Sequence, residues 1–529
     1  MSSPNVVPER SANLLETQKF QSQIGHISRH SSVFFAGTIF RLGTGYLFKV
    51  YLARALGAEP LGVYALGMTI IGFVGIFNGL GLPQAAVRFV ALYKASNKME
   101  QLRDFLLSAT GIILVVNLLL GLVVLSAGPW LAVHFYRTPS LSPHLKLFAV
   151  IMILGAFTTF FGKVLQGYRN VARLALITDF IGAPLTMLVA IALITVGAGL
   201  GGYIFAQIVS AAVVVVLLVA MVWRVTPAAV KHLKSTVRPP QREVLAFSTT
   251  VSGIGLLTFL IGQSDRVLIG HFLNARQLGV YAVSAAVVAY VPIALQSVNQ
   301  VFSPTITDLH ARGETELLGR VYQSLTKWVV VFTMPLALVL ITFAKPLMRI
   351  FGPDFEPGWI VLVIGTLGQL VNCGVGSAGY LLLMSGHERR LIKVQVVATA
   401  VTVGLGVFLV PRWGIAGAAF ATCITTILTN SWNLAQVRGI LGLFPYSRES
   451  FLRLILPTLG TTVAVLSCRI VFLKFGPVWV GISASMFVSY AAFLGISFLS
   501  GLGEDDLLIG RAVWSKIRGM LPVAGIGEE

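Results

Sequence analysis

Long apolar runs are the feature that most limits what this chain can fold into. Fourteen segments have about the 20 residues that an α-helix needs to cross roughly 30 Å of hydrocarbon. The runs are continuous and do not alternate, which excludes a membrane β-barrel. We therefore expect an all-α integral membrane protein with about fourteen transmembrane helices. The expected spans are 32–54, 61–82, 105–127, 147–166, 174–196, 200–223, 245–269, 278–302, 327–344, 358–380, 392–411, 414–437, 454–473 and 478–500.

Composition and charge agree with a membrane location. Of the 529 residues, 56% are hydrophobic and only 11% are charged, whereas a soluble domain carries about 25% charged residues. The net charge of +19 comes from basic residues that lie mostly between the apolar runs, and no nucleic-acid-binding motif is present. We therefore expect the lipid bilayer, and no nucleic acid, as a partner.

The basic residues also predict the orientation. Twenty-seven of the 39 basic residues lie in the two terminal tails and in the loops after even-numbered spans, and eight lie in the loops after odd-numbered spans. Cytoplasmic loops of membrane proteins carry the excess of lysine and arginine. Both termini are therefore predicted to be cytoplasmic.

The pentapeptide LGVYA occurs twice, at Leu61–Ala65 and at Leu278–Ala282. A shift of 217 positions also aligns FKVYLARALGAEPLGVYALG (Phe48–Gly67) with DRVLIGHFLNARQLGVYAVS (Asp265–Ser284). Matches farther along the chain, at shifts of 219 and 215, extend the similarity to most of each half. The copies start six spans apart. Because six is an even number, both copies enter the membrane from the same side. This predicts two parallel six-helix repeats followed by two C-terminal helices.

The repeat and the charged segments divide the chain into six parts. These are a cytoplasmic N-terminal tail (1–31), an N-lobe with helices 1–6 (32–223), a basic cytoplasmic linker (224–243), a C-lobe with helices 7–12 (244–437), a loop with helices 13 and 14 (438–500), and a cytoplasmic tail with an amphipathic segment suited to the membrane surface (501–529).

Three stretches resemble signatures of the polysaccharide-lipid flippases in the multidrug/oligosaccharidyl-lipid/polysaccharide exporter superfamily. Segments Ala53–Gly67, Ser264–Ala282 and Met384–Thr422 are similar to its helix 1–2, helix 7–8 and C-terminal regions. The resemblance implies a flippase that moves undecaprenyl-diphosphate-linked oligosaccharide, such as an O-antigen precursor, from the inner to the outer leaflet of a bacterial cytoplasmic membrane. It also implies polysaccharide polymerase or chain-length machinery as partners. The 6+6+2 layout is similar to the lipid-II flippase, whose extra helices form a groove for the lipid tail.

Cations within the spans are the main candidates for substrate binding, because a charge at the centre of a span costs about 2.5–3.5 kcal/mol. Arg41 and Lys49 share one face of the first span with two glycines, which leave room for a bulky anionic head group. Arg266 is the repeat mate of Lys49, so we expect the two at similar depth on opposite lobes. Arg88, at the inner end of the second span, is the candidate for the cavity entrance. The structural alternative is that these cations snorkel or form ion pairs.

Acids are scarce in the spans. Asp179 and Asp265 lie in a span or at its edge, and each is a candidate for a coupling-ion site or for a structural hydrogen bond. This scarcity disfavours an exporter of cationic drugs. No cofactor, metal site or enzyme motif is expected. The alternatives that stay open are a drug or metabolite exporter of the same fold and a membrane polysaccharide polymerase or ligase.

Overall fold

The computed structural model describes residues 43–231, 244, 248, 259–260, 262–475 and 478–499, and every regular element among them is helical. Besides helices over 43–56 and 262–272, the elements are α2 (Ala58–Val74), η1 (Gly75–Phe77), α3 (Leu82–Ala95), α4 (Met99–Trp130), η2 (Leu131–Phe135), η3 (Pro139–His144), α5 (Leu145–Gly167), α6 (Val171–Ala175), η4 (Leu176–Gly182), α7 (Ala183–Thr195), α8 (Gly199–Val225), α9 (Ala228–Lys231), α11 (Ala275–Val288), α12 (Ile293–Ala311), α13 (Thr315–Thr342), α14 (Ala344–Phe351), η5 (Pro353–Gly358), α15 (Trp359–Val375), α16 (Ala378–Met384), α17 (Glu388–Leu441), α18 (Arg448–Phe475) and α19 (Val478–Leu499).

Ten of the described helices are long and apolar enough to cross a membrane, or eleven if the bent pair of α11 and the start of α12 counts as one span. Three of the expected fourteen spans, 32–54, 245–269 and 478–500, lie partly outside the described residues. Two others, 392–411 and 414–437, lie in α17, which Gly414 interrupts with a non-helical φ of 59°. The two terminal tails and the linker beyond residue 231 also lie outside the described residues.

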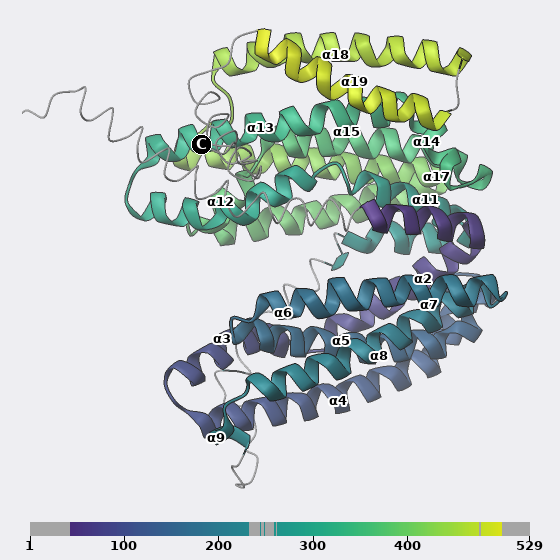
Figure 1. The fold of residues 1–529 in the computed structure, drawn as a ribbon, viewed down its shortest axis with the longest axis vertical. Helices are drawn as coiled ribbons and strands as arrows, with labels where there is room; N and C mark the ends of the chain where they lie inside the picture. The colour runs from purple at the N-terminus through teal and green to yellow at the C-terminus, as the bar shows by residue number, and fades with distance from the viewer. Residues whose placement is uncertain are drawn as a thin grey trace, which may run out of the picture.

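The helices form two groups (Figure 1). In the first group, α5 packs against α3, α4 and α8, and in the second group α15 packs against α11, α13 and α17. The last two helices, α18 and α19, pack on each other and on α13, on the side of the second group that faces away from the first (Figure 1).

Helix 43–56 precedes the first group in the sequence but packs against the second. Leu52 and Ala53 are buried in one apolar cluster with Leu347 and Phe351 of α14. In addition, Arg54 Nε donates a hydrogen bond of 2.7 Å to the Ile350 carbonyl oxygen. This helix therefore joins the two groups at one end of the molecule.

The two copies of LGVYA cross each other where the groups meet, on α2 and α11. A Cβ atom added to Gly62 would lie 1.6 Å from the carbonyl oxygen of Ala275. One added to Gly279 would lie 1.8 Å from the carbonyl oxygen of Ala58. Since 62 and 279, like 58 and 275, differ by 217 positions, equivalent residues of the two copies make equivalent contacts. Glycine in each copy is what allows the two backbones to approach this closely.

The second expected span is broken. It was predicted to run to residue 82, but α2 ends at Val74, a short 3₁₀ turn follows, and α3 starts at Leu82. Between them Leu80 and Gly81 have φ angles of 45° and 76°, a backbone region that a helix does not use. A bend of 53° separates α11 from α12 at the corresponding place in the second group.

Candidate functional site

Two of the predicted cations, Lys49 and Arg266, lie close enough to repel each other electrostatically. Lys49 is exposed on helix 43–56 and lies over the ring of Tyr290, with its Nζ 5.6 Å from the ring centroid. Arg266 is half-buried on helix 262–272, and its guanidinium donates a 2.8 Å hydrogen bond to Gln263 Oε1. Neither cation forms a salt bridge with a carboxylate of the described residues, and Arg266 Nε, which is buried, has no hydrogen-bond partner there.

Asp265 precedes Arg266 and attracts it, but its carboxylate accepts no hydrogen bond from the Arg266 guanidinium, which donates to Gln263 instead. The Tyr281 hydroxyl donates to Oδ2 over 2.6 Å, and the backbone N–H of Arg266 donates to Oδ1 over 2.7 Å. These bonds fix the start of helix 262–272 against α11. The geometry thus agrees with the structural alternative for Asp265.

Aromatic side chains surround the two cations. Tyr46 and Tyr290 meet edge to face with ring centroids 5.9 Å apart. On the side of the first group, the Tyr64 and Tyr203 rings lie 5.0 Å apart, and Gln207 Nε2 donates to the Tyr64 hydroxyl over 2.8 Å. Tyr64 is also within electrostatic range of Arg266, so residues from both groups lie near the cations.

Sequence reasoning did not find these aromatic residues, although a signal for two of them was present. Tyr64 and Tyr281 occupy the same position in the two copies of LGVYA, and both make a side-chain hydrogen bond in this region. Tyr203 and Gln207 come from α8, whose packing beside α2 is a tertiary contact that no local pattern encodes.

The other predicted site residues lie apart from this pair or outside the described residues. Arg41 is in the part of the chain that the structure does not describe. Arg88 is exposed on α3, with its guanidinium carbon 5.3 Å from the centroid of the Phe89 ring. Asp179 is half-buried in the π-helical segment η4 and interacts with neighbouring groups. Among the described residues, no group of three His, Cys, Asp or Glu side chains is arranged to hold a metal ion.

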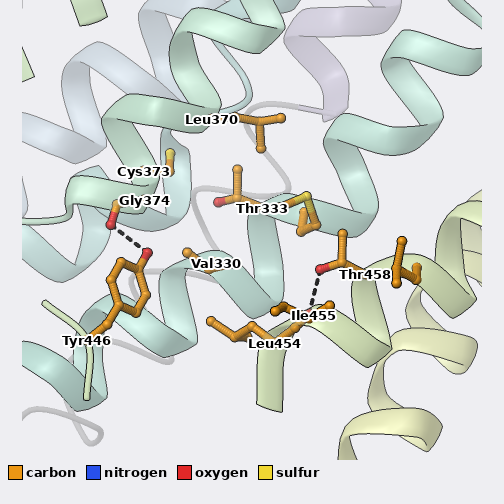
Figure 2. A pocket seen from close by; sticks show the side chains of 11 residues that line it. Val330, Thr333, Leu370, Cys373, Gly374, Tyr446, Leu454, Ile455 and Thr458 are labelled. Carbon is orange, nitrogen blue, oxygen red and sulfur yellow. Dashed lines mark hydrogen bonds between the residues drawn. The ribbon is translucent and has the colours of Figure 1, made fainter. Parts of the chain in front are cut away.

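An apolar pocket of about 280 Å³ lies between α13, α15 and α18 (Figure 2). Val330, Leu370, Cys373, Leu454, Ile455 and Leu459 line much of it. Two of its few polar groups are bonded to backbone: the Tyr446 hydroxyl donates to the Gly374 carbonyl oxygen and the Thr458 hydroxyl to that of Leu454. The third, the buried Thr333 hydroxyl, has no hydrogen-bond partner among the described residues. A pocket with this lining suits a hydrocarbon chain rather than a polar ligand.

Comparison with known proteins identifies a family and relatives that match most of the chain. A family described as polysaccharide biosynthesis protein matches residues 51–356. A probable flippase, AglR, of Haloferax volcanii is 22% identical over 76% of this chain and 81% of its own length. The lipid III flippase of Escherichia coli is 23% identical over 74% of this chain and 94% of its own.

Solved structures share the fold. The lipid II flippase MurJ in its inward closed conformation has a TM-score of 0.69 and 14% identity, with 88% of this chain and 98% of MurJ covered. An inward-facing multidrug transporter of the MATE family has a TM-score of 0.59 and 14% identity. The match covers 75% of this chain and 94% of that transporter.

Proposed function

The chain belongs to the polysaccharide biosynthesis protein family, and we propose that it is a flippase for undecaprenyl-diphosphate-linked oligosaccharide. It moves this substrate from the inner to the outer leaflet by alternating access between two lobes. The observation that carries the proposal is the pair of Lys49 and Arg266, two cations from opposite repeats that repel each other. An anion between them relieves this repulsion, and a diphosphate supplies acceptors for charge-assisted hydrogen bonds.

The layout of the chain is part of the proposal. Helices 1–6 and 7–12 form two parallel lobes, helices 13 and 14 follow, and both termini are cytoplasmic in a bacterial cytoplasmic membrane. The excess of basic residues in the loops on one side supports this orientation. The names of the relatives AglR and lipid III flippase support the same class of transport.

Each part of the substrate has a counterpart in this proposal. Lys49 and Arg266 hold the diphosphate, with Arg41 adding a third cation on the same helix as Lys49 and Arg88 acting at the inner entrance. The apolar pocket beside α18 accepts part of the isoprenoid tail, which the lining of Val330, Leu454 and Leu459 supports. Asp265 orients helix 262–272 through Tyr281 rather than carrying a coupling ion, and Asp179 is a structural residue.

Direct binding to the purified protein tests the substrate class. Native mass spectrometry in detergent should detect a complex with undecaprenyl diphosphate that carries a short oligosaccharide, since the two cations supply the affinity. The neutral alcohol undecaprenol should bind far more weakly, because it has no charge for Lys49 and Arg266. An organic cation should not bind at this site. Preference for the organic cation over the lipid diphosphate would instead favour a drug exporter of the same fold.

A further inference from the structure

A second cavity, of about 470 Å³, opens at the broken helix of the first group. Its walls are the C-terminal half of α2, the segment 78–81, the first turn of α3 and the middle of α5. None of the cations of the candidate site lines it. Met68, which does, lies one helical turn from Tyr64, or about 6 Å along the α2 axis.

This cavity lies near the middle of the membrane. Asn117 Nδ2 donates a 2.7 Å hydrogen bond to the carbonyl oxygen of Asn78, so the break in the helix and Asn117 are at the same depth. Asn117 is near the centre of the apolar run 105–127, about 18 Å from its inner end. Irregular backbone at this depth is tolerated where it is buried in protein or lines a cavity, and broken helices at the midplane form substrate sites in transporters.

The lining of the cavity combines apolar side chains with a few polar, uncharged ones. Among the described residues that line it, none is ionisable, and the polar side chains are the amides of Asn78 and Gln84 and the hydroxyl of Thr159. Five glycines also line it: Gly72, Gly75, Gly79, Gly81 and Gly155. The Gln84 side chain is exposed and lines the cavity. Its amide can both donate to and accept from hydroxyl groups of a ligand.

We propose that this cavity holds the neutral sugar next to the diphosphate, while Lys49 and Arg266 hold the diphosphate itself. The inference rests on the proposed function and assigns the glycan to a separate part of the site. The connection is geometric. Helices α2 and α11 cross at Gly62 and Gly279. On α11, Tyr281 donates to Asp265, the neighbour of Arg266. On α2, the cavity begins at Met68, six residues beyond Gly62. The first sugar of such a substrate is bonded directly to the phosphate. Neutral amides and backbone groups recognise sugar hydroxyls, whereas cations recognise the phosphates.

Gly155 offers a direct test, because a Cβ atom added there meets no other atom within 4 Å. Gly155→Leu therefore fills the cavity without a clash at the backbone. The matched control is Gly111→Leu on α4, where an added Cβ also meets nothing within 4 Å and which does not line the cavity. Both glycines are exposed positions in long helices of the first group. Binding is measured by native mass spectrometry with undecaprenyl diphosphate, either bare or carrying one neutral hexose.

The expected result is a loss of affinity for the sugar-bearing lipid of at least tenfold in Gly155→Leu, with binding of the bare lipid diphosphate unchanged. Gly111→Leu should bind both lipids as the wild type does. Gln84→Met, which keeps the volume of the side chain and removes its amide, should lower affinity for the sugar-bearing lipid several-fold and leave the bare lipid unaffected. This second variant keeps the test decisive if the leucine variant does not fold.

Unchanged binding of the sugar-bearing lipid by folded Gly155→Leu and Gln84→Met would overturn the assignment, as would an equal loss for both lipids. A wild-type protein that binds neither lipid would instead contradict the proposed function on which the assignment rests. The two failures are therefore separated by the wild-type measurement.

Discussion

Replacing Arg266 by alanine should lower the affinity for the lipid-linked diphosphate by about 10- to 150-fold. Hydrogen bonds to charged groups contribute about 1.5–3 kcal/mol, which corresponds to this range. The Arg266 guanidinium donates to Gln263 Oε1 but forms no salt bridge with a carboxylate of the described residues, so a phosphate oxygen supplies the anionic acceptor that the described part of the chain does not. Arg266→Lys should give intermediate affinity, because the charge is kept but the planar fork is lost.

The control for this prediction is Arg276→Ala, ten residues along the same segment. Arg276 is exposed and pairs with Asp354 over 2.6 Å at the surface, and such pairs contribute about 0–1 kcal/mol. Its loss should leave lipid binding unchanged. Equal affinity in wild type and Arg266→Ala, in isothermal titration of the purified proteins, would remove Arg266 from the binding site.

Replacing either crossing glycine by alanine should open the contact between the two groups and stop transport. The methyl group of Gly62→Ala would meet the Ala275 carbonyl oxygen, and that of Gly279→Ala would meet the Ala58 carbonyl oxygen. Overpacking of this kind costs about 1–3 kcal/mol, a factor of about 5–150 in the ratio of open to closed molecules. Because the contacts are equivalent, the two substitutions should have similar effects.

This opening is measurable with spin labels at Glu59 and Arg276, near the start of α2 and of α11, in a protein whose three cysteines have been replaced. Double electron–electron resonance should give one short distance between the two labels when Gly62 is kept, and a longer, broader distance distribution in Gly62→Ala. Gly201→Ala is the control, since an added Cβ there meets nothing within 4 Å. A distance distribution in Gly62→Ala identical to that of the control would show that the crossing does not hold the groups together.

The apolar helices were predictable from the sequence because hydropathy is a local property. The runs 147–166 and 200–223 lie within α5 and α8, and 454–473 lies within α18. Their ends were less accurate, since helices such as α4 and α13 extend beyond the apolar run that predicted them. The exact number of spans stays a prediction, because parts of three runs lie outside the described residues.

The break between α2 and α3 was missed for a physical reason. Leucine is apolar whether or not it is helical, so Leu80 and Leu82 kept the hydropathy of the run high across the break. The glycines and the proline of Gly79–Pro83 were the signal, and they coincide with the predicted end of the second span. A positive φ at Leu80 depends on the surrounding packing, which no local pattern contains.

The candidate site was predictable in part. The alignment of the two repeats brought Lys49 and Arg266 together as equivalent residues, and the structure has them within electrostatic range. Their role in binding stays a prediction. The partners of the pair could not be predicted, because Tyr203, Gln207 and Tyr290 reach it through the packing of helices that are distant in the sequence.

Leaflet-resolved transport tests the central claim most directly. The purified protein is reconstituted into proteoliposomes with undecaprenyl diphosphate that carries a fluorescent oligosaccharide, and an impermeant reagent destroys the glycans exposed on the outside. With wild-type protein, we expect the labelled lipid to move rapidly between leaflets, so that the protected fraction falls quickly. With Arg266→Ala or without protein, the protected fraction should fall slowly. The flippase assignment would be contradicted if the protected fraction were equally stable in vesicles with wild-type protein and in protein-free vesicles, although the same protein preparation binds the lipid.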